Sequence, residues 1–237
     1  GLQKNDEIIT TPLTFAATSN TAIQCGATPL FCDIRYDGNI DERKLEALIT
    51  PRTKAIVPVD FGGNPLPIQS IKALCEKHKL FLIEDASHAL GSEIDGKKVG
   101  NIADMTIFSF HAIKPITTFE GGAIATNNSD FYEKAKLLRS HGIVKKELWN
   151  SDMVLLGENY RLSDVACALG LSQLKRLDTF IQKRNEIAAF YDERFAKNPF
   201  FTTIAIDTSK RSARHLILFY LTAPFGVLKK RFLKRYM

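Results

Sequence analysis

The chain has 237 residues, 45% of them hydrophobic and 24% charged, a composition typical of a globular protein with a sizeable core. Its net charge of +6 would favour a nucleic-acid partner if the basic residues shared one face. Five of them instead crowd near the C-terminus: Lys229, Lys230, Arg231, Lys234 and Arg235. We therefore expect a solvated basic tail and no nucleic-acid partner. No apolar run is long enough for a membrane helix and no secretory signal opens the chain, so no membrane partner is expected.

The four cysteines indicate neither disulfides nor a metal site. Cys25, Cys32, Cys75 and Cys167 form no C-x-x-C pair, and they lie within apolar stretches. We expect reduced, buried thiols in a cytoplasmic protein.

Strand-like and helix-like segments alternate over the first two-thirds of the chain. Short apolar runs predict strands at 7–11, 29–33, 55–59, 80–83, 105–110 and 123–126. Longer amphipathic runs predict helices at 16–25, 41–49, 67–78 and 130–140. Asp41 is placed to cap the second helix, and Pro67 suits the first turn of the third. The alternation predicts an α/β domain built on a mostly parallel sheet.

The pattern changes to longer helices after residue 163. These helices are expected over 163–174 and 179–196, and strands over 200–206 and 216–221 would then open a smaller α+β unit. We divide the chain accordingly into a large domain, 1–178, and a linking helix with the start of a small domain, 179–237.

Polar residues stand where predicted parallel strands end. Asp85 closes one strand, and Ser109 lies near the end of another. Ligands of open α/β sheets bind beyond the carboxyl ends of the strands, so both residues are candidates for a site. No G-x-G-x-x-G follows a strand and no G-x-x-x-x-G-K-[ST] occurs, so dinucleotide and P-loop functions lack their main support.

Six short segments, in order along residues 7 to 190, resemble the DegT/DnrJ/EryC1/StrS family of pyridoxal-phosphate-dependent sugar aminotransferases. They are TFAAT (14–18), GATPLFCD (26–33), EDASHALG (84–91), SFHAIK (109–114) with EGG (120–122), RSHG (139–142) and NYRLSD (159–164). Each segment is weak alone, whereas six in register are specific. The run KPITT (114–118) is most similar to the branch that aminates a UDP-linked 4-keto sugar in the pseudaminic acid pathway.

The resemblance implies an aspartate-aminotransferase-like large domain (fold type I) with pyridoxal 5'-phosphate (PLP) as the cofactor. It also implies transfer of an amino group, from a donor such as glutamate, to a nucleotide-linked 4-keto sugar. The product would serve surface-glycan or nonulosonic acid biosynthesis.

The same resemblance assigns the two central catalytic residues. Lys114 would carry the cofactor and then move the α-proton of the substrate, because a desolvated amine can act as nucleophile and base. Asp85 would keep the pyridine nitrogen protonated so that the ring accepts electrons. A solvated surface lysine and a helix-cap aspartate are the plainer interpretations, but Ala112, Ile113 and Pro115 beside Lys114 are untypical of a surface helix.

Three more residues are implied around the cofactor. His88 would lie near the ring, Phe15 would stack on its opposite face, and Ser109 would bond the phosphate. Core packing is the alternative for Phe15, one of 16 phenylalanines. A metal site at Glu84, Asp85 and His88 is a further alternative, although no H-E-x-x-H or other dense ligand spacing supports it.

Two assignments rest on the resemblance alone. Asn159 would reach the phosphate of the cofactor in the partner subunit, which implies a homodimer with a shared active site. His111 would face the sugar substrate. Without the resemblance, Asn159 is only part of a loop before a helix.

Two departures from the family pattern suggest an incomplete chain. The family has a Gly-Thr/Ser-Ala segment at a helix N-terminus that cradles the cofactor phosphate, and the sequence starts after that point, at Gly1. The resemblance also fades after His215. We therefore expect weak cofactor binding and low turnover from the chain as given, and a non-catalytic family member stays open as an alternative.

Other enzyme classes are also open. A sugar dehydratase of the same family has histidine at the lysine position, so Lys114 argues against it. A metal-dependent hydrolase would have to use Asp85, His88 and His111.

Overall fold

A six-stranded sheet forms the centre of the computed structural model, which describes residues 1–147, 149–207 and 209–222. The predicted basic tail lies outside the described residues. The strand order is β2-β1-β3-β4-β7-β8. All neighbouring pairs are parallel except β7 and β8, which confirms the predicted α/β class. The strands are β1 (Glu7–Thr10), β2 (Thr28–Phe31), β3 (Thr53–Ile56), β4 (Phe81–Asp85), β7 (Met105–Ser109) and β8 (Gly122–Ala125).

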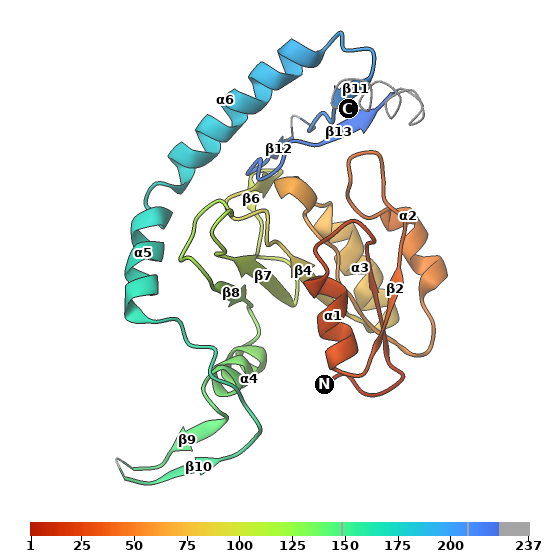
Figure 1. Cartoon of the computed structure of the whole chain (residues 1–237). Helices are drawn as coiled ribbons and strands as arrows, with labels where there is room; N and C mark the ends of the chain where they lie inside the picture. The colour runs from red at the N-terminus through yellow and green to blue at the C-terminus, as the bar shows by residue number, and fades with distance from the viewer. Residues whose placement is uncertain (148, 208, 223–237) are drawn as a thin grey trace, which may run out of the picture.

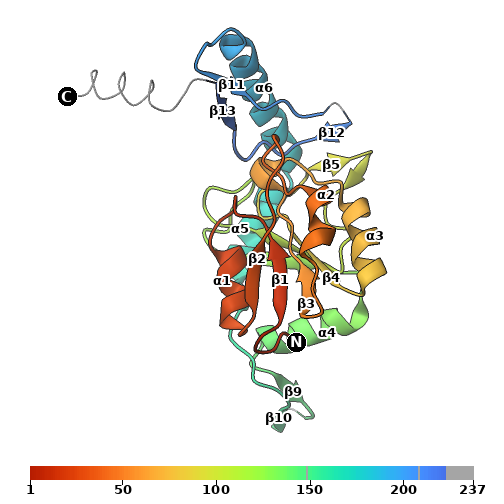
Figure 2. The same cartoon turned by 90° about the vertical axis from the view of Figure 1, so that its right-hand side faces the viewer.

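Helices cover both faces of the sheet (Figures 1 and 2). One face carries α1, and the opposite face carries α2 and α3. Asp41 caps α2 as predicted, because its carboxylate accepts from the Arg43 N–H. The helix predicted over 41–49 tightens into a 3₁₀ turn, η1, shortly before Pro51, a residue that disfavours helix at the position preceding it. The bounds are α1 (Ala17–Gln24), α2 (Glu42–Leu45), η1 (Glu46–Leu48), η2 (Phe61–Gly63), α3 (Ile68–His78), α4 (Ser129–Arg139), α5 (Asp164–Leu174) and α6 (Leu177–Phe195).

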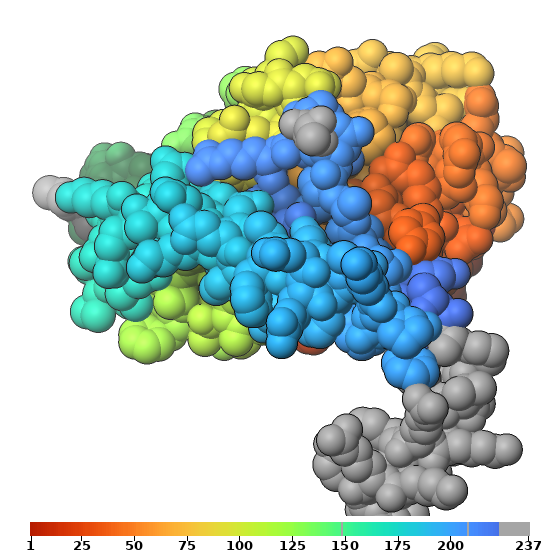
Figure 3. All heavy atoms as spheres, turned by 90° about the horizontal axis from the view of Figure 1, so that it is seen from above, coloured from red at the N-terminus to blue at the C-terminus, as the bar shows by residue number. Residues whose placement is uncertain are grey.

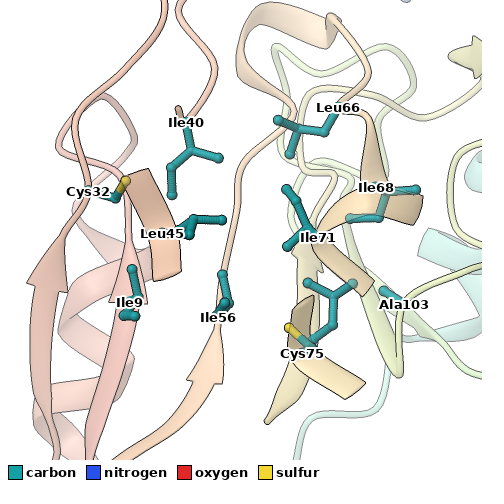
Figure 4. Close-up of a cluster of buried hydrophobic side chains, with 11 residues drawn as sticks. Ile9, Cys32, Ile40, Leu45, Ile56, Leu66, Ile68, Ile71, Cys75 and Ala103 are labelled. Carbon is teal, nitrogen blue, oxygen red and sulfur yellow. The ribbon is translucent and has the colours of Figure 1, made fainter. Parts of the chain in front are cut away.

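Apolar side chains from the strands and from α2 and α3 form the main core (Figure 4). Ile9 and Ile56 point from the sheet toward Leu45, and Ile71 and Cys75 extend the cluster along α3. All four residues of β1 are buried, as expected of a strand that is covered on both faces of the sheet. This core fixes the strands whose carboxyl ends carry the candidate site.

The short ribbons of the fold were not predicted. They are β5 (Glu93–Ile94), β6 (Lys97–Lys98) and β12 (Lys210–Arg211) in one sheet, and β9 (Ile143–Lys145) with β10 (Ser151–Met153) in a hairpin that projects from the body (Figure 1). Strands of two or three residues are too short to show a period. The strand predicted at 55–59 also ends early, at Ile56, because Pro58 has no N–H to donate, and only a bridge from Val59 to Asp85 continues the pairing.

The C-terminal part of the described chain contains the predicted pair of strands. Two short strands, β11 (Phe201–Thr203) and β13 (Phe219–Leu221), pair antiparallel beside α6. The rings of Phe195, Phe201 and Phe219 pack together with centroids 5.0 to 5.8 Å apart. Seen from above, α6 spans one face of the molecule, and the chain after it lies against the earlier part of the chain (Figure 3). The division at residue 178 stays a prediction.

The burial predicted for the cysteines is right for two of them and wrong for the other two. Cys32 and Cys75 are buried, whereas Cys25 and Cys167 are exposed, and all four thiols are free. Cys25 falls just past the end of α1, and Cys167 belongs to α5, a helix with no fully buried residue. Within the described residues, no helix combines the length and the apolar character that crossing a membrane requires.

Candidate active site

Asp85 stands at the carboxyl end of β4, at the edge where the parallel strands finish. Its two carboxylate oxygens are held separately. The Thr18 hydroxyl donates to Oδ2 at 2.8 Å, and the Ser87 backbone N–H donates to Oδ1 at 3.1 Å. The Thr14 hydroxyl lies 2.9 Å from that of Thr18 and extends the chain of polar contacts. Helix α1 and the turn after β4 therefore fix the orientation of this carboxylate.

Lys114 lies in the turn that follows β7, next to the strand end that carries Asp85. Its backbone N–H donates to the His111 carbonyl at 3.0 Å, which closes the turn. The side chain is half-buried, and its Nζ makes no hydrogen bond or ion pair with any described residue. Burial lowers the pKa of Lys114, and the nearby Asp85 carboxylate acts in the opposite direction. The site therefore holds a partly desolvated amine within electrostatic reach of a fixed carboxylate.

His88 is buried beside these two residues. Its Nδ1 accepts from the Gly62 N–H at 3.3 Å, and its ring packs on Phe61 with centroids 5.8 Å apart. Burial, and then the charge of Lys114, lower the pKa of His88 to about 4. Its imidazole is consequently neutral at pH 7.

Ser109 and His111 lie on the same segment as Lys114 but are more open. Ser109 ends β7, opposite Gly122, and its hydroxyl accepts from the His111 N–H at 3.4 Å. The His111 ring is exposed, with Nε2 3.6 Å from the Glu120 carboxylate. Both residues lie on the segment that leads from β7 to Lys114, and their side chains could bind a phosphate or a substrate.

Phe15 and Asn159 are not brought into contact with Lys114. Phe15 precedes α1 and is 74% exposed, so the alternative of core packing is wrong for this residue. Asn159 is exposed and bridges to Ser140 at the base of the β9–β10 hairpin. The role implied for Asn159, in the cofactor site of a partner subunit, stays a prediction.

Two buried carboxyl groups lie behind the strand end. Asp60 and Glu84 are almost completely buried, and burial raises the pKa of both. The Glu84 carboxylate accepts from the Thr106 hydroxyl at 2.9 Å, and Oδ1 of Asp60 accepts from the Leu66 N–H at 2.8 Å. Oδ2 of Asp60 is buried without a partner among the described residues. Burial raises the pKa of Asp60 and thereby favours its protonated form in the folded protein. Nowhere in the described ranges do three His, Cys, Asp or Glu side chains gather so as to hold a metal ion.

Sequence reasoning missed two residues of the site. Thr18 belongs to the TFAAT segment, but nothing in the sequence indicates that it holds Asp85. Its burial on α1 is visible only in the fold. His215 stacks on His88 with ring centroids 4.4 Å apart, although it comes from the far end of the chain. No local pattern links His215 to His88, so only the tertiary structure reveals the pair.

A separate hollow of about 610 Å³ is lined by residues that include Arg35, Asp37, Asn64 and Lys210. Lys114 is not among its lining residues. The arginine is already paired with Asp37 and with another carboxylate. The hollow combines positive and negative side chains and therefore favours no particular class of ligand. The residues with the chemistry described above lie at the strand ends instead.

Residues 1–236 match the model of the DegT/DnrJ/EryC1/StrS aminotransferase family. The chain belongs to this family. It is 57% identical over 230 residues to a Campylobacter jejuni UDP-4-amino-4,6-dideoxy-N-acetyl-beta-L-altrosamine transaminase, covering 96% of this chain and 61% of the relative. A Helicobacter pylori transaminase of the same name is 49% identical, again with 61% of its length covered. The chain thus spans about three-fifths of the length of these relatives.

Solved structures of the family have the same fold. Helicobacter pylori PseC, an aminotransferase involved in the biosynthesis of pseudoaminic acid, superposes with a TM-score of 0.92, covering 96% of this chain and 61% of that one. A Streptococcus pneumoniae protein described as a sugar aminotransferase, in its PLP form, gives 0.86 at 31% identity and covers 94% of this chain and 62% of that one. The predicted family and fold class are confirmed, and the predicted cofactor agrees with the PLP form of this relative.

Proposed function

We propose that this chain carries the cofactor-binding machinery of a PLP-dependent aminotransferase that transfers an amino group to a nucleotide-linked 4-keto sugar. The observation that carries the proposal is Lys114, a half-buried amine without a partner among the described residues, opposite the fixed carboxylate of Asp85. The similarity to the Campylobacter and Helicobacter transaminases supports a UDP-linked sugar as the acceptor. A donor such as glutamate, a role in surface-glycan or nonulosonic acid biosynthesis, and a cytoplasmic location complete the proposal.

The side chains at the strand ends fit the chemical groups of PLP. An aldehyde needs an amine, a pyridinium nitrogen needs a carboxylate, and a phosphate needs hydroxyl or N–H donors. Lys114, Asp85 and Ser109 supply these three groups from neighbouring strand ends. The Phe15 ring is exposed, and its carbonyl accepts from the N–H of Thr18, the residue whose hydroxyl holds Asp85, so the ring is available to cover one face of a flat cofactor.

Each residue then has a defined task. PLP, when bound, supplies an electron sink for the substrate carbon. Asp85 keeps a proton on the ring nitrogen, while Lys114 binds the aldehyde and moves the α-proton of the substrate. The lowered pKa of Lys114 increases the fraction of neutral amine, the form that can act as nucleophile and base. The neutral His88 ring beside them is a hydrogen-bond donor toward the cofactor. The exposed His111 side chain contacts the sugar.

A homodimer is part of the proposal, with Asn159 at the exposed hairpin base serving the site of the partner subunit. Large apolar side chains on and beyond the hairpin are strongly exposed, and a second copy of the chain would bury them. They are Trp149, Met153, Leu156, Tyr160 and Val165.

Cofactor attachment tests the proposal directly. The chain is mixed with PLP, reduced with borohydride, digested and mapped by mass spectrometry. We expect the label on Lys114 and its loss in Lys114→Ala. Lys210→Ala is the matched control, because Lys210 is also a half-buried lysine with a pKa lowered by burial, but it lines the other hollow. A label on another lysine, with Lys114 free, would overturn the assignment. Amination of a panel of nucleotide keto sugars then tests the substrate class.

A further inference from the structure

The imidazole rings of His215 and His88 form a stacked pair inside the site. Their centroids are 4.4 Å apart and their planes are inclined by 37°. His215 belongs to residues 212–216, a segment after α6 that we call the strap. Nδ1 of His215 is buried and has no hydrogen-bond partner among the described residues. The ring contact with His88 is the interaction recorded for this side chain among the described residues, and the strap determines where the ring lies.

The strap is anchored to η2, which contacts His88. The Ser212 hydroxyl donates to the Gly63 carbonyl at 2.8 Å, and the Leu216 N–H donates to the Gly62 carbonyl at 3.2 Å. On its other side, the Asn185 amide of α6 donates to the Ser212 carbonyl at 3.0 Å. Hydrogen bonds on both sides of His215 thus fix the strap in position.

Gly63 permits this close approach. Its φ is +90°, a region that residues with a Cβ rarely adopt. An added Cβ would lie 2.9 Å from the His88 carbonyl oxygen, 3.0 Å from the Arg214 nitrogen and 3.2 Å from the His215 nitrogen. All three are backbone atoms, which cannot rotate away. The turn at Gly63 is therefore shaped to hold the His88 backbone and the strap together.

The hydrogen bond from Gly62 determines which nitrogen of His88 carries a proton. Nδ1 accepts from the Gly62 N–H, so the neutral ring bears its proton on Nε2 and is a donor there. Burial, His88 and the cations Lys114 and Arg184 lower the pKa of His215 to about 3, so the second ring is neutral as well. Two neutral rings can stack beside an ammonium group, whereas two imidazolium ions could not.

We propose that His215 is a positioning residue that holds the His88 imidazole in the orientation in which Nδ1 faces Gly62 and Nε2–H is offered to the cofactor site. The proposal rests on the proposed function, in which His88 lies near the cofactor ring. Without the second ring, His88 can rotate or admit water, and Nε2–H is no longer held in one direction.

The experiment compares His215→Ala and His215→Phe by NMR of ¹⁵N-labelled imidazoles in the cofactor-free protein at neutral pH. His215→Phe keeps an aromatic ring against His88, and the control is His78→Ala, at the end of α3, where the His78 ring pairs with Glu46. We expect His88 to remain in the Nε2–H form in wild type, His215→Phe and the control. In His215→Ala we expect its signals to shift toward a mixture of tautomers. Turnover of the PLP-loaded protein should fall about 10- to 100-fold in His215→Ala and much less in His215→Phe.

Two outcomes would overturn the proposal. An unchanged His88 signal in His215→Ala would show that the second ring does not position it. An equal loss of turnover in both variants, with the His88 signal intact in His215→Phe, would show that His215 acts through its own Nδ1. The NMR result does not depend on transaminase activity, so failure of this proposal can be told from failure of the proposed function. If His215→Ala does not fold, as seen by circular dichroism, His215→Leu takes its place, because it also lacks an aromatic ring but fills more of the space.

Discussion

Asp85 has one hydrogen bond on each carboxylate oxygen, from Thr18 and from Ser87. In Asp85→Asn the amide keeps an acceptor for one of these donors but cannot hold a positive charge on a cofactor nitrogen. We expect the fold to be retained and turnover to fall. A charge-assisted hydrogen bond is worth about 1.5–3 kcal/mol, which corresponds to roughly 10- to 100-fold in rate.

Steady-state kinetics and thermal melting measure this effect. Asp95→Asn is a suitable control, because Asp95 is exposed and has φ of +51°, a conformation that asparagine tolerates well. Near-normal turnover in Asp85→Asn would be incompatible with a carboxylate at the ring nitrogen.

Asp60 predicts a pH dependence of stability. Burial, and then the charge of Glu84, raise its pKa well above the usual range. Above about pH 4, the unfolded chain releases a proton that the folded chain keeps. Stability therefore falls as pH rises from there toward the folded pKa, and each tenfold difference in proton affinity costs about 1.4 kcal/mol.

Asp60→Asn replaces the carboxyl with an amide that does not titrate, and the amide oxygen still accepts from the Leu66 N–H. We expect the variant to be at least as stable as wild type at pH 7, with a flatter stability profile between pH 4 and 7. Urea unfolding at several pH values measures both. A clear loss of stability at pH 7 would mean that Asp60 is ionised in the folded protein.

At the scale of elements, the strands that carry Asp85 and Ser109 could be predicted because each is a buried apolar run followed by a polar residue. The hairpin and the small ribbons could not, since their two- or three-residue strands have no period and their sequence is mostly polar or exposed. His215 escaped prediction for a different reason: its contact with His88 arises from the docking of the strap on Gly62 and Gly63. Contacts of this kind depend on the packing of distant segments.

The base of the β9–β10 hairpin predicts a further effect. Gly142 has φ of +65°, and a Cβ there would lie 1.9 Å from the Leu155 carbonyl oxygen. Gly142→Ala must open the hairpin base, which also carries the bridge between Ser140 and Asn159. We expect a loss of stability of at least about 1 kcal/mol and weaker association of subunits.

Thermal melting and sedimentation velocity measure these two effects. Gly96→Ala is the matched control, because Gly96 has φ of +73° but no atom within 4 Å of an added Cβ. The same loss in both variants would show that backbone strain alone is responsible, and that the packing of the hairpin base has no special role.

At the scale of the whole molecule, the residues of the proposed site come from two separate parts of the fold. Lys114, Asp85 and His88 lie at the strand ends, whereas Asn159 lies at the base of the projecting hairpin (Figure 1). A homodimer resolves this separation if the hairpin of each subunit reaches the site of the other. Exposed apolar residues such as Trp149 and Leu156, each 82% accessible, supply the surface for such an interface.

Mixing inactive variants tests the shared site. Lys114→Ala and Asn159→Ala chains should each have low turnover alone. When they are unfolded together and refolded at equal concentrations, half of the dimers should be mixed, and each mixed dimer has one site with both lesions and one with none. Turnover should therefore recover to about a quarter of the wild-type value. Recovery requires that Asn159 act in the opposite subunit. If both residues served the same subunit, every site would carry one lesion, and turnover would stay at the level of the separate variants.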